Sequence, residues 1–339
     1  MAHLSGPAGD TQETASNAER GQLLLVAVLV LAAAFIILAL VVNSAIFTEN
    51  LATRDSVAGS EDALEYRSEV VDSVGTMIVD ANENGIEQEP NITDERIELS
   101  ERSGFEQALR GGVLSVGGLT TTSGQRIAQD NGTRNLTSIN NTADWRLAEG
   151  VRQVRNVRFA FTDVDADGFW IFDEPFKMHV RGSNGSSWTM EVSDEFGVFT
   201  DAIGITVETP SNTASCVQRQ SAVEGDFTVD VTAATMDGEP CHALNRLSDG
   251  TEMWLGTGIA APYEIEFENG DNADGTYSMV TDASANPVIE NLHHNPDTPP
   301  GEPYYITDAI YSVELPYTYQ THAVAYETDV RVAPGEVPP

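Results

Sequence analysis

An apolar run near the N-terminus constrains this chain more than any other feature of its sequence. The run covers residues 23–42, and no charged residue interrupts it. A helix needs about 20 apolar residues to cross a hydrocarbon core of about 30 Å, whereas the apolar region of a cleaved secretory signal has only about 7–15. The sequence therefore predicts that 22–43 is a transmembrane helix that stays in the mature protein.

Basic residues near the run predict its orientation. Arg20 directly precedes the run, and the first arginine after it is Arg54. Since basic residues favour the cytoplasmic side, we expect a single-pass protein of the cell membrane with a cytoplasmic N-terminus and an extracellular C-terminal domain. Matches to the N-glycosylation pattern, which belongs on exported surface loops, agree with this and predict a glycoprotein. They begin at Asn91, Asn131, Asn135, Asn140 and Asn184.

The charge balance of the chain is strongly acidic. Asp and Glu total 53 against 17 Lys and Arg, a formal net charge of −36. Such a charge destabilises a compact fold by self-repulsion unless salt screens it, so we interpret the surface as one suited to very high salt. A cation-binding role is the alternative. Nucleic-acid binding through a basic patch is excluded.

A helical stalk is predicted after the apolar run, over residues 44–84. This stretch contains no proline, and its apolar residues recur at helical spacing on one face, with charged residues opposite. Residues 58–60 are the one place where the helix could bend, and the sequence after 80 is a plausible stop. The predicted apolar face consists of Leu64, Val70, Val71, Val74, Met77 and Ile78.

The rest of the chain divides into three more parts. Residues 1–21 form a small, polar leader, and 85–150 read as a mixed region of helix and loop. From 151 to 339 apolar and polar residues alternate in short runs, including a hairpin around the turn at 182–185, which predicts an extracellular β domain. The expected fold class is α+β: a long N-terminal transmembrane and amphipathic helix followed by an antiparallel, sandwich-like β-sheet head.

The two cysteines, Cys216 and Cys241, both follow the apolar run. An even pair in an exported domain usually forms a disulfide, worth roughly 3–4 kcal/mol for a loop of about 25 residues. Two free thiols, or Cys241 and His242 as metal ligands, are the alternatives.

One motif in the β domain matches the calcium-loop pattern, in the stretch DVDADGFWIFDE. Carboxylates on alternate residues of a tight loop can converge on a hard cation within about 2.3–2.6 Å. The flanking sequences are strand-like, so an ordinary acidic turn is an equally good interpretation. The residues that would bind Ca²⁺ are Asp163, Asp165, Asp167, Phe169 through its carbonyl, and Glu174.

No catalytic motif stands out, and we expect that the chain is not an enzyme and requires no cofactor, with Ca²⁺ the one candidate ligand. The only basic concentration lies at Arg146, Arg152, Arg155 and Arg158. In so acidic a chain we expect these arginines to pair with carboxylates of their own domain rather than with a neighbouring subunit.

The residues Arg20, Gly21 and Gln22 carry a family resemblance when they are read together with the apolar run behind them. The order of a basic residue, a glycine and then a long apolar helix resembles the class III signal of archaeal type IV pilin-like proteins. The sequence of residues 19–54 is also similar to an uncharacterised pilin-like family of haloarchaea. The resemblance implies cleavage between Gly21 and Gln22 by a prepilin-peptidase-like enzyme. It also implies other pilin-like subunits as partners, although Val26 stands where many bacterial pilins carry a glutamate.

The function expected from these features is structural. The chain is interpreted as a membrane-anchored, surface-exposed pilin-like protein of a halophile, of the minor pilin or pseudopilin type. The alternative is a permanently anchored extracellular protein that binds a cation or another ligand and does not assemble into a filament.

Overall fold

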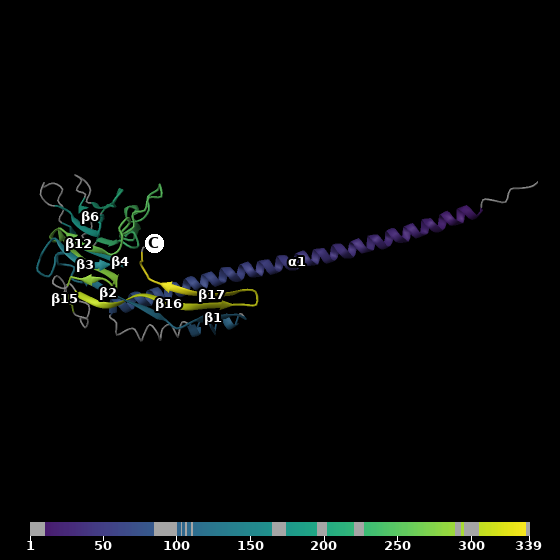
Figure 1. The fold of residues 1–339 in the computed structure, drawn as a ribbon, viewed down its shortest axis with the longest axis horizontal. Coiled ribbons are helices and arrows are strands. Elements are labelled where there is room, and N and C mark those ends of the chain that lie inside the picture. Colours follow the sequence, from purple (N-terminus) through teal and green to yellow (C-terminus); the bar gives the residue numbers. More distant parts are fainter. Residues whose placement is uncertain are drawn as a thin grey trace, which may run out of the picture.

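A long helix and a β head make up the computed structural model of this chain (Figure 1). The structure describes the backbone of residues 11–84, 100–102, 104–105, 107–109, 111–164, 174–194, 202–219, 227–288, 293–294 and 305–336. Within the helix, side chains are described at 28–43 and 60–83.

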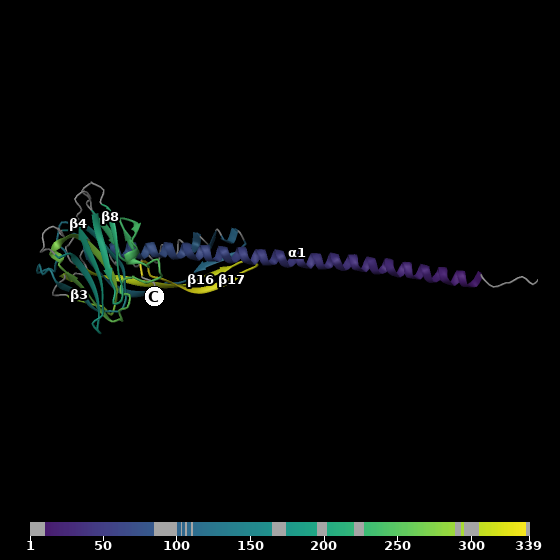
Figure 2. The same cartoon turned by 90° about the horizontal axis from the view of Figure 1, so that it is seen from above.

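Helix α1 spans Thr11–Asn84, so the helix is not interrupted at 58–60. Its C-terminal part lies along strands β16 and β17 of the head, and the rest projects away from it in both views (Figures 1 and 2). A helix of this length rises about 1.5 Å per residue, so its N-terminal end lies far from the head.

The predicted fold class, α+β with a transmembrane helix, is wrong, and so is the predicted single-pass localisation. The chain is mainly antiparallel β-sheet, and within its described part no helix is both long enough and apolar enough to cross a membrane.

The larger sheet has ten strands in the order β1-β16-β2-β13-β4-β9-β10-β11, with β15 and β17 also paired to β16. All its pairs are antiparallel except β15 with β16. The strands are β1 (Val113–Val116), β2 (Thr120–Gln129), β4 (Val154–Val164), β9 (Phe227–Asp230), β10 (Thr235–Met236), β11 (Glu239–Pro240), β13 (Ala273–Asp282), β15 (His293–His294), β16 (Tyr305–Gln320) and β17 (Ala325–Val332).

The smaller sheet has seven strands in the order β14-β3-β12-β5-β6-β7-β8, all antiparallel. The predicted hairpin is confirmed, since β5 and β6 pair across the turn at 183–186. In the described part of the chain, the short 3₁₀ helices η2 (His242–Leu244) and η3 (Gly270–Asn272) lie between strands. The strands are β3 (Trp145–Val151), β5 (Phe176–Gly182), β6 (Ser187–Asp194), β7 (Ala202–Glu208), β8 (Thr213–Arg219), β12 (Tyr263–Glu268) and β14 (Asn286–Pro287).

In the stretch 85–150, expected as mixed helix and loop, the described backbone is helical at 100–102, 104–105 and 107–109, and strands β1, β2 and β3 of the two sheets follow. Strand β2 illustrates why the sequence pattern does not reveal these strands. Its sequence TTTSGQRIAQ has few apolar residues, yet β13 and β16 pair with it on either side. Backbone pairing on both edges stabilises such a strand where side-chain alternation gives no signal.

Two large hydrophobic cores and a small cluster of Val280, Ala309 and Tyr311 stabilise the described part of the head. The main core lies between the sheets, where Phe159, Phe176 and Phe267 pack ring against ring with centroids 5.3–5.9 Å apart. A second core joins α1 to β1, β16 and β17. Strand β16 belongs to both cores, with Ile306 in the first and Val313 in the second, and a register shift between Ile310 and Ser312 separates its two halves.

Candidate functional site

The part of α1 at residues 28–42, here called the exposed apolar segment, carries most of the large apolar side chains that are exposed in the described part of the chain. Its large apolar side chains, from Val28 to Val42, are all between 48% and 68% exposed. Because successive helical residues point about 100° apart, exposure at nearly every position means that no side of the segment is covered. An apolar surface of this extent marks a site of interaction with a partner.

The C-terminal half of α1 packs on the head with one face. The buried residues of this packed half are Ala63, Val70, Val74, Ile78 and Ala81. The predicted face was wrong at one end, since Leu64 is 56% exposed and its neighbour Ala63 is buried instead.

Aromatic side chains of β16 explain this shift in the buried face. The hydroxyl of Tyr317 donates a hydrogen bond of 2.9 Å to the carbonyl of Ala63, and the ring of Tyr66 stacks on Tyr319 with centroids 6.0 Å apart. A ring can approach the backbone this closely only beside a small residue, so alanine rather than leucine occupies the contact position.

A buried polar junction joins the end of α1 to the head. The side-chain amide of Asn82 donates to the carbonyl of Ile310 at 3.0 Å and accepts from its N–H at 2.8 Å. Arg155 on β4, fully buried, donates to the same carbonyl at 2.6 Å, to that of Tyr311 at 2.7 Å and to that of Pro334 at 2.8 Å. The register shift in β16 is therefore held by α1, β4 and the C-terminal segment together.

Burial changes the pKa of Arg155 at this junction. Removal from water lowers the pKa of Arg155 to about 10, while the carboxylate of Glu336 acts in the opposite direction. The guanidinium stays charged near neutral pH, which strengthens its bonds to the carbonyls. The sequence analysis missed this role, because it expected Arg155 to pair with carboxylates, whereas the guanidinium binds backbone carbonyls. The one signal was its place in the strand-like stretch VRNVRF.

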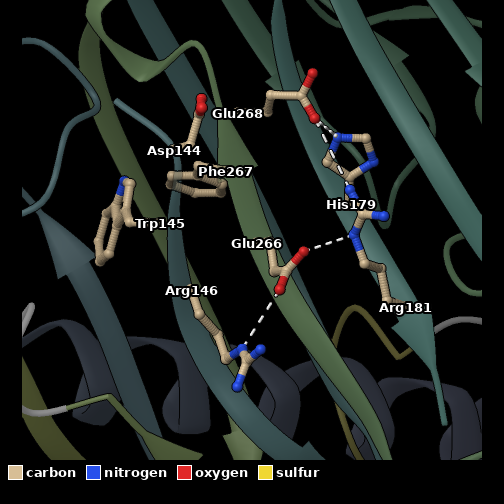
Figure 3. Close-up of a pocket in the computed structure, with 8 residues that line it drawn as sticks. All are labelled: Asp144, Trp145, Arg146, His179, Arg181, Glu266, Phe267 and Glu268. Atoms are coloured by element: carbon tan, nitrogen blue, oxygen red, sulfur yellow. Dashed lines mark hydrogen bonds and ion pairs between the residues drawn. The ribbon is translucent and has the colours of Figure 1, made fainter. Parts of the chain in front are cut away.

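The outer face of the smaller sheet carries a network of charged side chains around a hollow of about 300 Å³ (Figure 3). Glu266 on β12 lies between Arg146 on β3 and Arg181 on β5 and pairs with both. Arg146 also lies 3.0 Å from Glu264, so the expected pairing of this arginine within its own domain is confirmed. Alternating charges on adjacent strands stabilise the sheet, since opposite charges directly across a strand pair attract.

A hydroxyl, an imidazole and a carboxylate follow one another in this network. His179 is 2.9 Å from Thr189 through Nδ1 and 2.9 Å from Glu268 through Nε2. Burial, and next the charge of Arg181, lower the pKa of His179, so the ring is neutral near pH 7 and can donate to one partner while accepting from the other.

The order of groups is the one that a hydrolase uses, but their setting is not. His179 and Thr189 face each other on neighbouring strands, and the backbone N–H groups of β5, β6 and β12 are engaged in the ladder. Donors for an oxyanion are therefore not provided by these strands, and stabilisation of the oxyanion is usually the largest catalytic effect. We interpret the trio as part of a stabilising network.

The predicted calcium loop lies mostly outside the described residues, which do not include Asp165, Asp167 and Phe169. Asp163 is exposed near the end of β4, and Glu174 is exposed just before β5, where its carbonyl accepts a hydrogen bond from Asn272. No group of three potential metal ligands occurs within the described part of the chain. Calcium binding by this loop stays a prediction.

The predicted glycosylation sites differ in what the structure says of them. Asn91 lies outside the described residues, and Asn131, Asn135, Asn140 and Asn184 are all exposed. The side chains of Asn131 and Asn184 each accept a hydrogen bond from the backbone two residues on, at 3.1 and 3.0 Å. Exposure leaves these asparagines accessible, and their modification stays a prediction.

The predicted cleavage site lies within α1. The backbone is helical at Arg20, Gly21 and Gln22, and their side chains are not among those described. Cleavage at this position stays a prediction.

The predicted disulfide is confirmed. Cys216 on β8 and Cys241, just before η2, are bonded to each other with their Cα atoms 5.8 Å apart. The bond ties an edge strand of the smaller sheet to the segment that follows β11, and it removes Cys241 from the possible metal ligands.

No family model, curated protein or solved structure matches this chain.

Proposed function

We propose that this chain is a pilin-like structural subunit that assembles with other copies of itself through helix α1. The exposed apolar segment is the observation that carries the proposal. An apolar helix that is exposed on all sides is stable only when neighbours cover it, and each large apolar side chain gains about 1.5–3 kcal/mol on burial.

The occupant that fits this surface is the same segment of neighbouring copies. A single flat partner would cover one side of the helix, whereas several parallel copies would cover all sides. The segment also lies away from the head, so the head of the same chain does not block the approach of other copies to it (Figure 1). Subunits of a filament meet both conditions.

The resemblance of residues 20–22 to a prepilin cleavage site supports the same function. Removal of residues 1–21 would leave Gln22 as the first residue, directly ahead of the apolar run. The acidic surface favours a halophilic setting, in which salt screens the repulsion between heads that assembly brings together.

The test places one carboxylate on either half of α1. The full chain and its Leu31→Glu and Leu64→Glu variants are compared by sedimentation velocity and electron microscopy in molar NaCl without detergent. Leu31 and Leu64 are 57% and 56% exposed, so the two changes are matched in chemistry and exposure. We expect large assemblies for the wild type and Leu64→Glu, and their loss in Leu31→Glu.

A wild-type chain that stays monomeric would contradict assembly and favour a binding protein that acts alone. Equal assembly of all three chains would show that the exposed apolar segment is not the contact surface.

A further inference from the structure

A second hollow, of about 350 Å³, lies on the larger sheet, where strands β2, β13, β4 and β9 run side by side. Two arginines line it, Arg126 from β2 and Arg158 from β4, on either side of Ser278 from β13. Neighbouring strands are about 4.8 Å apart, so strands β2 and β4 lie about 10 Å apart, the width of a small ligand and its contacts. We call this place the arginine hollow.

Arg126 is held rigidly at this hollow. Its side chain is only 9% exposed, and it donates from Nε to Ser278 at 3.0 Å and from Nη1 to the hydroxyl of Tyr305. The remaining nitrogen, Nη2, lies 3.7 Å from Asp130, which is too far for a hydrogen bond. A fixed, largely buried guanidinium therefore keeps donors that the described residues leave unused.

Arg158 offers more donors at the opposite side. Its Nε donates to Asp230 at 2.7 Å, and Asp230 is itself fixed by the N–H of Ala233 at 2.7 Å. The two terminal nitrogens of Arg158 have no partner among the described residues, and the side chain is 50% exposed. An arginine that is anchored through Nε presents its outer N–H pairs for the bidentate recognition of a carboxylate.

The rest of the lining selects among anions. Asp130 and Asp230 also line the hollow, and hydroxyl groups come from Thr276, Ser278 and Thr228. The two carboxylates repel a dianion such as sulfate more strongly than they repel a monoanion. A sugar acid has one carboxylate for the arginines and several hydroxyls, which both donate and accept, for the other groups.

We propose that the arginine hollow binds a hexuronate, the acidic sugar unit of anionic polysaccharides, with its carboxylate held by Arg158 and Arg126. The inference is independent of assembly through α1, since the hollow lies on the larger sheet of the head. It assigns to the head a contact with acidic polysaccharide.

The experiment titrates the full chain with glucuronate, with glucose and with sulfate, by calorimetry or ligand-observed NMR, at the lowest salt in which the protein stays folded. We expect saturable binding of glucuronate, none of glucose, and no displacement of glucuronate by equimolar sulfate. Absence of saturable glucuronate binding would overturn the proposal. Displacement by sulfate as effective as by glucuronate itself would overturn the assignment to a sugar.

Two variants test the residues. Arg158→Gln should weaken glucuronate binding at least about tenfold, since a charge-assisted bidentate contact is lost. Arg246→Gln is the matched control, because Arg246 is 55% exposed and pairs with Glu252 at 2.6 Å outside the hollow. Equal weakening in both variants would reduce the effect to net charge and refute the site.

Thr276→Val keeps the shape of the lining and removes one hydroxyl, so it should weaken binding severalfold without unfolding the chain. Unchanged affinity in both Arg158→Gln and Thr276→Val would place any binding elsewhere. Thermal melting of each variant verifies that the head is folded before its affinity is interpreted.

Discussion

Helix α1 contains two apolar regions that the structure treats in opposite ways. The exposed apolar segment at 28–42 is uncovered on all sides, whereas the packed half, from Ala63 to Ala81, buries a single face against β16 and β17. The packed half alternates apolar and charged residues, so one face can meet the head while the other meets water. The exposed apolar segment has no polar face, and the single chain does not cover its apolar side chains.

The two regions of this one helix therefore serve different processes: one is buried when the chain folds, and the other is buried only when chains assemble. Contacts of the packed half stabilise the head itself. Contacts of the exposed apolar segment stabilise only what forms between chains. A substitution in the packed half should therefore change the unfolding free energy of the head, whereas the same substitution in the exposed apolar segment should change assembly.

The largest effect is expected from Val74→Asp in the packed half. Val74 is fully buried, and an uncompensated buried carboxylate costs about 3–5 kcal/mol, in addition to the lost packing. Urea unfolding followed by circular dichroism should show this loss. The same change at Leu29, which is 68% exposed, should leave the unfolding free energy of the head within about 0.5 kcal/mol of wild type. A similar loss in both variants would break the comparison.

A smaller effect is expected from Asn82→Ala at the junction. The change leaves the buried N–H of Ile310 without its partner at 2.8 Å, at a cost of about 1–3 kcal/mol. Hydrogen exchange should rise at Ile310 and along the end of α1. Arg155 still holds the carbonyl of Ile310, so β4 should keep its protection. Faster exchange throughout the head would show that the junction is not local.

The sequence predicted some of these features and missed others for identifiable reasons. The hairpin of β5 and β6 and the disulfide Cys216–Cys241 were predictable, because turn residues and an even cysteine count are local signals. The burial of Ala63 in place of Leu64 was not, because it depends on the ring of Tyr317, more than 250 residues away. Hydropathy ranks Leu above Ala and carries no information on that contact.

The membrane-spanning interpretation failed for a related reason. An apolar run indicates that a helix needs an apolar environment, but the run does not indicate whether a membrane or another protein surface provides that environment. Strand β2 failed in the opposite way, since its polar sequence hides a strand paired on both edges. The arginine hollow is lined by residues from five strands, so no single stretch of sequence could have shown it.

Lower salt should weaken both the fold of the head and the assembly through α1, and the Leu31→Glu variant separates the two effects. Lowering NaCl from about 1 M to about 0.1 M lengthens the Debye length from about 3 to 10 Å, so repulsion within a chain of charge −36 grows. We expect the head to lose roughly 1 kcal/mol, a fall in Tm of about 2–4 °C. Assembly should weaken as well in the wild type, whereas Leu31→Glu should show the change in Tm alone. A Tm that is constant over this range would remove the argument for a halophilic surface.

The smallest effect concerns pH and the C-terminal segment beside the packed half. Glu336 accepts hydrogen bonds from Arg331 and from Tyr311, each at 3.0 Å, and it lines a hollow next to Gly75 of α1. Burial alone would raise the pKa of Glu336, but the bonds from Arg331 and Tyr311 and the charge of Arg155 outweigh it, so the pKa lies below its usual value. Because the folded-state pKa is the lower one, the carboxylate stabilises the fold above its unfolded pKa of about 4.3, and this contribution is lost as the pH falls through the folded value.

Solvent screens this partly exposed group, so its contribution should not exceed about 1 kcal/mol. Glu336→Gln should therefore lower the Tm slightly at pH 7 and have no such effect at the acid end of the folded range. Glu252→Gln removes the carboxylate of an exposed pair with Arg246, far from α1 in sequence, and serves as the matched control. Exchange at Gly75 and Val79 should rise with falling pH in the wild type and be insensitive to pH in Glu336→Gln, once the intrinsic rate of exchange is removed. If both chains gave the same pH dependence there, the C-terminal segment would have no part in holding the packed half of α1, and only β16 and β17 would distinguish it from the exposed apolar segment.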